Sequence, residues 1–263
     1  MFLKYRRLIL SAFLVVFFAV LLVSVFRTSF EGDELIYRAL AIKLENLQSY
    51  NLKDTDILNT LPKQIYNTEI FFYPPTFISV LSLFHIFLGG LGFKLVAPLL
   101  FIVFCFVIYK TVYLLTESKN IAYKGLLISI FSPMLLFLSV RSSMDLFMST
   151  MALIAFYFIV KFKKEEKKVF IFLSGLFIVI AILTKYIPII ILVFYIPILL
   201  QIVYKNKLAK QIYLFLIPFS LVFIWFFYLF QSNPSFSFFM HQENSKVLET
   251  YKFLDYAYHR PFF

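Results

Sequence analysis

Four short polar stretches contain the residues that could do chemistry. Asp33 and Glu34 form an acidic pair in the first stretch, and Asp145 lies in the third. A positioned carboxylate can take or give a proton during a reaction. Lys185 lies in the fourth stretch, directly before Tyr186. An ammonium group at a membrane surface suits the phosphate of a lipid headgroup, so Lys185 is a candidate phosphate ligand.

Each of these residues also has a purely structural interpretation. Asp33 could be the N-cap of a helix, and Glu34 would complement the positive end of that helix. Ser142 and Asp145 have the spacing of a capping box. Lys185 could extend its charged end to the membrane surface without binding a ligand. Taken singly, each residue fits the structural interpretation better, and only their combination favours a function.

The second stretch is Tyr73-Pro74-Pro75, directly before a short apolar segment. Proline is favoured in the first turn of a helix, so the pair predicts a helix start. A helix needs about 20 apolar residues to cross a bilayer, and Thr76–Leu88 is much shorter. We therefore predict a re-entrant or interfacial helix for Thr76–Leu88.

The whole composition predicts a membrane protein. Hydrophobic residues make up 62% of the 263-residue chain and charged residues only 15%. About 25% of residues are charged in an average soluble protein. A soluble domain of this length could not bury so much apolar surface. The predicted fold class is therefore an all-α polytopic membrane protein.

Seven apolar runs are predicted to be transmembrane helices. Four of them contain a proline, which membrane helices tolerate when neighbouring groups satisfy the freed carbonyls. The first run follows Lys4, Arg6 and Arg7 and has no small-residue cleavage site after it, so we expect an uncleaved span. The predicted spans are Leu8–Phe26, Phe93–Leu115, Ile121–Val140, Met144–Val160, Val169–Thr184, Ile187–Tyr204 and Gln211–Phe230.

Charge predicts which span ends are cytosolic. With a cytosolic N-terminus and seven crossings, the inside segments hold fourteen Lys and Arg residues against three Glu residues. The largest inside group is Lys161–Lys168. If Thr76–Leu88 also crossed, this group would lie outside, against the positive-inside rule. Seven crossings therefore place the C-terminus outside and gather all four polar stretches on the outer face.

One transmembrane module is predicted over residues 1–230, followed by an extracytoplasmic tail over residues 231–263. The first outer loop of the module, residues 27–73, contains the amphipathic segment Asp33–Leu47. Such a segment after a span is typical of a helix that lies along the membrane surface. Its apolar stripe is formed by Ile36, Leu40, Leu44 and Leu47.

Several classes of site are excluded by the sequence. The single cysteine, Cys105, lies in an apolar run, so no disulfide or thiolate metal site is expected. The three histidines are far apart in the sequence, and no metal or other cofactor is predicted. The net charge of +11 comes from short basic clusters between apolar runs, which indicates membrane topology and not nucleic-acid binding.

The order of the four polar stretches resembles the GT-C superfamily of membrane glycosyltransferases. The resemblance is to the branch that contains protein mannosyltransferases and aminoarabinose transferases. Asp33 and Glu34 with Tyr37 are similar to the acidic motif in the first outer loop of that branch. Tyr73-Pro74-Pro75 is similar to its H/K-P-P motif, with Tyr73 in place of His or Lys.

The two later stretches complete the resemblance. The segment from Arg141 to Asp145 is similar to the region of the second aspartate in these enzymes. Leu183-Thr184-Lys185 is similar to their L-T-K motif. The resemblance covers most of residues 1–230.

This resemblance implies an inverting glycosyltransferase that moves a sugar from a polyprenyl-phosphate donor to an acceptor hydroxyl on the extracytoplasmic face. Asp33 would be the base that deprotonates the acceptor, and Glu34 and Asp145 would be further catalytic carboxylates. Lys185 and Arg141 would bind the donor phosphate. Support for the substrate site would come from Tyr37, Tyr73, Pro74 and Pro75.

The implied partners are the lipid bilayer, the sugar donor, and an acceptor that is a protein, a lipid or a glycan. Enzymes of this branch usually continue through further spans, so a partner subunit that completes the fold is also expected. Two alternatives stay open. One is a non-catalytic or truncated GT-C-like module that acts by association. The other is a lipid or polysaccharide transporter, which would favour ionisable residues near span centres, where this sequence has almost none.

Overall fold

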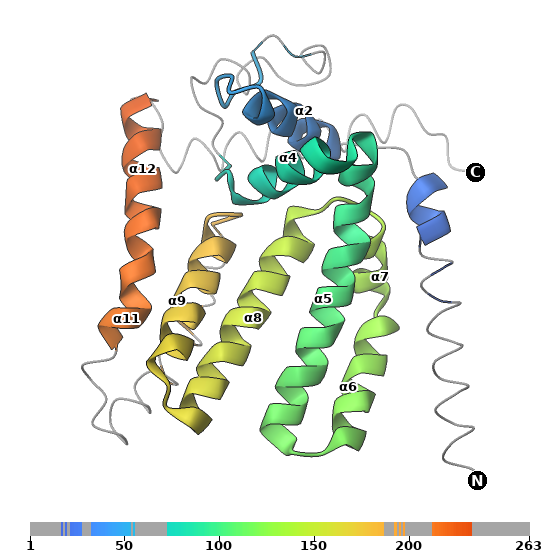
Figure 1. Ribbon diagram of the computed structural model, residues 1–263, viewed down its shortest axis with the longest axis vertical. Coiled ribbons are helices and arrows are strands. Elements are labelled where there is room, and N and C mark those ends of the chain that lie inside the picture. Colours follow the sequence, from blue (N-terminus) through green and yellow to red (C-terminus); the bar gives the residue numbers. More distant parts are fainter. Residues whose placement is uncertain are drawn as a thin grey trace.

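The computed structural model describes residues 17, 19, 22–27, 33–53, 55, 73–186, 192, 193, 195, 197 and 212–232. Over these residues the chain is helical, without a strand. Apolar helices stand upright side by side, and two shorter helices, α2 (Asp33–Glu45) and α4 (Thr76–Leu88), lie across one end of them (Figure 1). We call the end with α2 and α4 the upper end, and the opposite end the lower end.

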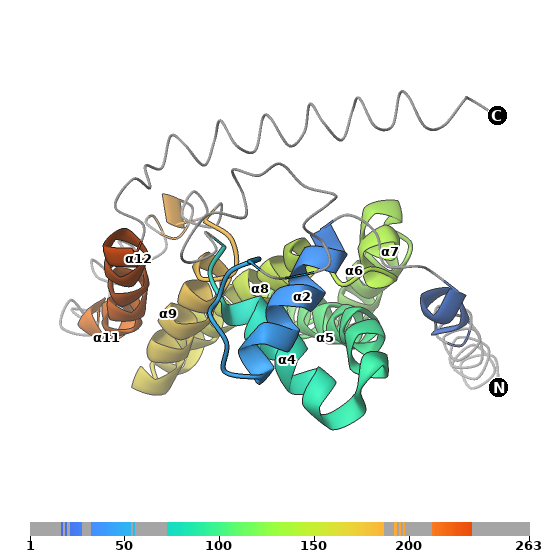
Figure 2. The same cartoon turned by 90° about the horizontal axis from the view of Figure 1, so that it is seen from above.

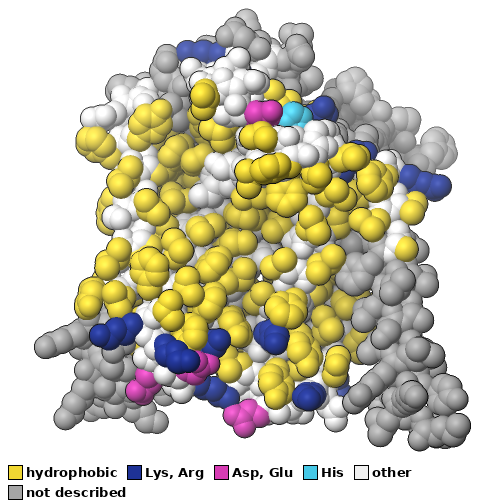
Figure 3. Space-filling model, in the orientation of Figure 1, with side chains coloured by type: hydrophobic (Ala, Val, Ile, Leu, Met, Phe, Trp, Pro, Cys, Tyr) yellow, Lys and Arg dark blue, Asp and Glu magenta, His cyan; other side chains and the backbone are white. Residues whose placement is uncertain are grey.

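The upright helices form the membrane part of the molecule. They are α5 (Gly90–Thr116), α6 (Lys119–Ile130), α7 (Pro133–Ser139), α8 (Met144–Glu165), α9 (Lys168–Ile182), α11 (Ile212–Leu216), η3 (Ile217–Phe219) and α12 (Ser220–Ser232). Three helices are long and apolar enough to cross a membrane: α5, α8, and the combined helix from α11 to α12. A fourth candidate is the bent pair of α6 and α7. Their outward surface is a broad apolar band, as expected for a helical membrane protein (Figure 3).

The seven predicted spans are therefore shown only in part. Leu8–Phe26 and Ile187–Tyr204 fall mostly outside the described residues. Val169–Thr184 corresponds to α9, which has 15 residues and is shorter than the ~20 residues that a full crossing needs. The described part of the chain thus supports a helical membrane protein with three or four candidate spans.

The predicted span Ile121–Val140 is broken in its middle. Its α6 ends at Ile130, and α7 begins at Pro133 after an extended Ser132 with φ −67° and ψ 117°. Proline has no amide hydrogen and disfavours a helical residue before it. The two helices are consequently bent by 65°. By contrast, Pro98 lies inside α5 without ending it, as the sequence predicted.

The upper end matches the predictions for its two helices. The amphipathic segment predicted from Asp33 is helical as far as Glu45, and Leu47 lies beyond it with a positive φ of 53°. The apolar face of α2 is buried, with Leu40 fully inaccessible. Thr76–Leu88 is a single 13-residue helix, α4, with the predicted bounds. Seen from above, α2 and α4 lie over α5 and α8 (Figure 2).

A glycine turn joins the lying helix α4 to the upright helix α5. Gly89 has φ +58°, a backbone conformation that glycine adopts without steric cost. A Cβ atom on Gly92 would lie 2.2 Å from the carbonyl oxygen of Phe84, so only glycine permits this close approach. The chain therefore changes direction here because two of its glycines allow it.

Among the described residues, two turns between antiparallel helices lie at the lower end. One turn joins α5 to α6 and the other joins α8 to α9. The Nζ atom of Lys164 lies 2.6 Å from Oε1 of Glu117, so the two turns are in contact. Lys, Arg and acidic side chains gather there, below the apolar band (Figure 3). The two turns predicted to be cytosolic thus share one end of the molecule, opposite the four polar stretches.

Candidate functional site

The acidic pair lies in the first turn of α2. Glu34 is buried, with 9% of its surface exposed. Its Oε1 atom accepts a hydrogen bond of 2.6 Å from the backbone amide of Ser142. The hydroxyl of Ser142 in turn donates to the carbonyl oxygen of Phe93 in α5. Glu34 therefore joins α2 to the corner between α7 and α8, which is a positioning contact that sequence analysis did not identify.

The corner before α8 is capped differently from the predicted pattern. The capping-box interpretation used Ser142, but the N-cap of α8 is Ser143. The hydroxyl of Ser143 accepts a 3.1 Å hydrogen bond from the amide of Asp145. The prediction was wrong by one residue because the Ser142 side chain is engaged in the tertiary contact with Phe93. The carboxylate of Asp145 is thereby left for another contact.

Asp33 is bonded to Tyr37, one helical turn later in α2. The Tyr37 hydroxyl donates a hydrogen bond to the Asp33 carboxylate. Burial raises the pKa of Tyr37 well above its ordinary range, and the charges of Asp33 and Asp145 raise it further. Tyr37 therefore stays protonated and remains a donor. Its ring also packs edge-on against Tyr73 at 6.5 Å, which brings the second polar stretch to the first.

Asp145 and Lys185 form an ion pair across the upper end. The Nζ atom of Lys185 lies 2.8 Å from Oδ1 of Asp145. The side chain of Lys185 is 28% exposed and that of Asp145 is 43% exposed. The pair is therefore partly accessible, so a soluble or membrane-bound ligand can compete for either member. This contact joins the third and fourth polar stretches.

The Pro-Pro stretch is joined to the L-T-K stretch by the residue that follows it. The Thr76 hydroxyl is hydrogen-bonded to the carbonyl oxygen of Leu183 and lies 2.9 Å from the Thr184 hydroxyl. The Thr76 amide also donates to Leu183, at 3.4 Å. Pro74 is buried and Pro75 precedes the first residue of α4. The contact residue, Thr76, was not predicted, although its position directly after two prolines marks the helix start.

All four predicted stretches thus meet at the upper end of the bundle. The first contacts the second through Tyr37 and the third through Glu34. The third and the fourth share the Asp145 ion pair. Arg141 belongs to the same corner, and its guanidinium lies 4.9 Å above the ring of Phe137 in α7. Its predicted role as a phosphate ligand stays a prediction.

Two further contacts at the upper end were not predicted from the sequence. Nδ1 of His85 in α4 lies 2.6 Å from Oε2 of Glu45 in α2, which ties the two lying helices together. The His85 ring also stacks on Phe93 at 4.6 Å. No sequence signal could have found this pair, because the two residues are 40 positions apart and lie on different helices.

The second missed contact joins α12 to the residue after Lys185. Nε1 of Trp225 donates a 3.2 Å hydrogen bond to the Tyr186 hydroxyl. Tyr186 also stacks on Phe226 at 5.3 Å. Burial raises the pKa of Tyr186 to about 12, so its hydroxyl stays neutral. Trp225 is the single tryptophan of the chain, which was an available signal for a specific contact.

The arrangement can bind an anion and accept a proton. A lysine and two aspartates lie together with a protonated tyrosine, which suits a reaction between a phosphate-bearing and a hydroxyl-bearing substrate. Among the described residues, no group of three or more His, Cys, Asp or Glu side chains could hold a metal ion. The upper end is therefore described as a polar cluster of amino-acid side chains.

The class that fold and site define is a helical membrane protein with a polar cluster at one end of its helices. Comparison with protein-family models, with curated proteins and with solved structures finds no match for the chain. The resemblance to the GT-C superfamily therefore rests on the order of the motifs.

Proposed function

We propose that this protein is a GT-C-type glycosyltransferase that moves a sugar from a polyprenyl-phosphate donor to an acceptor hydroxyl on the extracytoplasmic face of the membrane. The observation that carries the proposal is the ion pair between Lys185 and Asp145, which unites the L-T-K stretch with the second aspartate. Asp33 lies near the pair, because Tyr37 is hydrogen-bonded to Asp33 and the charge of Asp145 raises the pKa of Tyr37.

The proposed reaction is an inverting displacement at the sugar carbon that bears the phosphate. The acceptor oxygen forms a bond to this carbon while the bond from the carbon to the phosphate oxygen breaks. Asp33 takes the proton of the acceptor hydroxyl, which is worth about 10²–10⁴ in rate for a positioned base. The leaving phosphate keeps the bonding electrons, and Lys185 holds its negative charge.

The ion pair gives the two substrates an order in this proposal. In the structure, the ammonium group of Lys185 is paired with Asp145, whose Oδ1 atom lies 2.8 Å from Nζ. A donor phosphate must replace Asp145 on Lys185, which frees the Asp145 carboxylate for the acceptor. Donor binding would therefore prepare the acceptor site. Asp145→Asn should tighten donor binding, because it removes the competing charge, and should also slow transfer.

Charge supports the proposed side of the membrane. The lower end contains the basic segment Lys161–Lys168 and the turn with Lys119, both of which the positive-inside rule assigns to the cytosol. The stretches that carry the polar cluster, at the starts of α2, α4 and α8 and after α9, lie at the opposite end of the same helices (Figure 1). A cluster on the extracytoplasmic face suits a donor whose prenyl chain stays in the membrane.

The main rival is a non-catalytic module of the same fold. It is favoured by the contacts of Glu34 and Thr76, which hold distant segments together and need no substrate to explain them. Under this rival the Asp145–Lys185 pair would be one more structural contact. The two proposals predict different effects of Asp33→Asn on sugar transfer.

The decisive experiment uses membranes that contain the full-length chain and a panel of radiolabelled polyprenyl-phosphate sugars. Wild type should transfer label to an endogenous acceptor, and Asp33→Asn and Lys185→Ala should each reduce transfer at least ~100-fold. Asn keeps an acceptor oxygen for the Tyr37 hydroxyl in the first turn of α2, so Asp33→Asn should leave folding and membrane level nearly unchanged. Lys185→Arg should retain part of donor binding, although its planar group differs from an ammonium.

The matched control is Lys164→Ala, which removes a lysine from an ion pair at the lower end and should leave transfer unchanged. Full activity of Asp33→Asn would contradict the assigned base. If the wild type turned over none of the donors in the panel, the non-catalytic module would be the better function.

A further inference from the structure

The turn that carries Lys185 is hydrogen-bonded to the start of α4. Thr76, the first residue of α4, donates its hydroxyl to the carbonyl oxygen of Leu183, which also accepts the Thr76 amide at 3.4 Å. The hydroxyl oxygens of Thr76 and Thr184 lie 2.9 Å apart. Lys185 is the next residue along the chain. Both residues directly before Lys185 are therefore in contact with another helix.

These hydrogen bonds complete the end of α9. A helix leaves its last four carbonyl groups without a partner inside the helix, and α9 ends at Ile182. The Thr184 hydroxyl donates to the carbonyl oxygen of Ile180 at 2.8 Å, and the carbonyl of Leu183 accepts the bonds from Thr76. Glycine commonly ends a helix, but this turn contains none. Two threonine hydroxyls fix the turn instead.

The bonds of Thr76 are directed at this one turn and do not belong to a broad interface between helices. The helix α4 packs mainly against α2 and α5. Its second residue, Phe77, contacts the ring of Phe147 in α8 at 5.4 Å. Thr76 is partly buried between these elements and the end of α9. Its hydroxyl therefore has a local task, which is to hold the turn after α9.

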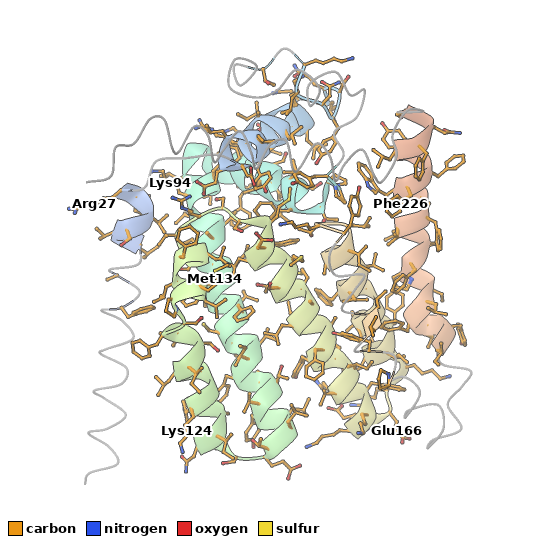
Figure 4. All side chains as sticks on the ribbon, turned by 180° about the vertical axis from the view of Figure 1, so that it is seen from behind. Arg27, Lys94, Lys124, Met134, Glu166 and Phe226 are labelled. Carbon is orange, nitrogen blue, oxygen red and sulfur yellow. The ribbon has the colours of Figure 1, made fainter. Side chains whose placement is uncertain are left out.

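The residue after Lys185 is anchored as well. Nε1 of Trp225 donates to the Tyr186 hydroxyl, and the Tyr186 ring stacks on Phe226. Figure 4 shows Phe226 on α12, in the upper half of the molecule. Lys185 thus lies between two anchored neighbours, and its Nζ atom lies 2.8 Å from Oδ1 of Asp145. A long side chain keeps one geometry only when the backbone that carries it is held in place.

We propose that Thr76 is a positioning residue for Lys185. By fixing the turn after α9 to the start of α4, it keeps the ammonium group directed at Asp145 and, under the proposed function on which this inference rests, at the donor phosphate. Thr76 itself touches no substrate and acts only through Lys185. The lying helix α4 would then be part of the donor site, although the charge that holds the donor is carried by a residue beyond α9.

The test is the rate at which the Lys185 amine of the full-length protein in detergent is acetylated by water-soluble N-hydroxysuccinimidyl acetate, measured by mass spectrometry of peptides. An amine in a charge-assisted contact must leave its partner before it reacts. Thr76→Val keeps the shape of the side chain but loses the hydroxyl, and should raise the rate about threefold, as expected for one lost hydrogen bond. Asp145→Asn removes the ion pair and should set the upper limit, about fivefold. Thr76→Ser keeps the hydroxyl and should retain the wild-type rate.

A general loosening of the fold gives a different result from loss of positioning. Lys164, paired with Glu117 at the lower end, is an internal reference in the same sample and should react at an unchanged rate. Thr76→Val should add nothing in an Asp145→Asn background, because the pair is already absent. The matched control is Thr150→Val, which removes a buried hydroxyl bonded within α8 and should leave the Lys185 rate unchanged. Thr184→Val removes the other hydroxyl of the contact and should raise the rate, so the test does not depend on one variant.

An unchanged Lys185 rate in Thr76→Val would overturn the proposal. Equal rises at Lys185 and Lys164, or a further rise on top of Asp145→Asn, would do so too, because the effect would then be a loosened fold. In the transfer assay, Thr76→Val should lower kcat/KM for the donor about threefold and Thr76→Ser should restore it. Full kcat/KM in Thr76→Val would overturn the role toward the donor. If the wild type turned over no donor, the transferase would fail, while the acetylation rates would still decide whether Thr76 positions Lys185.

Discussion

Lysines form ion pairs with carboxylates at both ends of the bundle, but their surroundings differ. At the lower end, Lys164 and Glu117 are 39% and 79% exposed. At the upper end, Lys185 and Asp145 are 28% and 43% exposed, and Glu34 beside them is buried. The upper charges are fixed by backbone contacts between distant segments, whereas the lower ones contact each other in solvent.

This difference separates two uses of charge in one membrane protein. The hydrogen bond and charge of Lys164 hold the pKa of Glu117 below its usual value, yet solvent and salt screen such an exposed pair. Lower-end charges therefore contribute mainly through their number, and under the proposed topology this number places their end in the cytosol. Upper-end charges act through their position, because contacts between distant segments hold them in place.

The largest expected effect concerns the side of the membrane on which each end lies. It is measured by labelling single cysteines in whole cells with a membrane-impermeant reagent, in a Cys105→Ser background. Gln48→Cys lies in the exposed stretch after α2 at the upper end, and Lys168→Cys is exposed at the lower end. Gln48→Cys should be labelled directly, and Lys168→Cys only after the membrane is opened. Ser174→Cys, fully buried in α9, is the negative control. The reverse pattern would invert the proposed orientation.

A large effect on stability is expected at the glycine turn below α4. A Cβ at Gly92 would meet backbone atoms of Phe84 and His85 at 2.2–2.9 Å, which cannot move without shifting α4. Gly92→Ala should therefore lower the free energy of unfolding by about 2–3 kcal/mol. At Gly90 nothing lies within 4 Å, so Gly90→Ala should be neutral or slightly stabilising. Thermal unfolding in detergent measures both, and similar melting temperatures would contradict the close approach.

Glu34 and Glu117 offer a matched pair of acids from the two ends. Glu34→Ala leaves the buried amide of Ser142 without its acceptor, which should cost about 1–3 kcal/mol. Glu117→Ala should leave the melting temperature unchanged because the side chain is exposed. Glu34→Gln keeps an acceptor oxygen and should recover most of the stability.

Glu34→Gln also tests the catalytic role that the motif resemblance gives this residue. If transfer is lost while stability is recovered, the charge of Glu34 is needed for chemistry. If both are retained, Glu34 acts only as the acceptor for Ser142.

The smallest expected effect is the coupling energy of the two ion pairs. A double-mutant cycle with Asp145→Asn and Lys185→Met should give about 1 kcal/mol, since the pair is partly exposed. The same cycle with Glu117→Gln and Lys164→Met should give no measurable coupling at physiological salt. Equal coupling at the two ends, measured by chemical unfolding in detergent, would remove the energetic distinction between them.

Helix positions could be predicted from the sequence because they follow local patterns. The bounds of α4 were set by two prolines before it and glycines after it, and both signals are local. The break between α6 and α7 was missed, since Pro133 and Pro98 look alike in an apolar run. Only Pro133 ends a helix, and Ser132 is extended before it. Packing decides between these outcomes.

The site could be predicted only as a set of stretches. Each stretch was placed at a helix end, and the topology predicted that all four share one end of the bundle. The contact partners could not be predicted, because Glu34 with Ser142 and Thr76 with Thr184 are both 108 positions apart. A local sequence pattern cannot reveal contacts between residues so far apart. For the same reason Ser142 was assigned as a cap, although its hydroxyl is hydrogen-bonded to the distant Phe93 and Ser143 is the N-cap.

Because its contacts join residues far apart in the sequence, the polar cluster should form late in folding. Contacts between residues far apart in sequence require loop closure before they yield any stabilisation, so they form after local ones. The helical hairpins of α5 with α6 and of α8 with α9 can form as soon as each pair has been synthesised. The hydrogen bonds of Thr76 cannot form until Leu183 and Thr184 have left the ribosome. A nascent chain that ends before Leu183 can therefore have the hairpin of α5 with α6 but not yet the complete polar cluster.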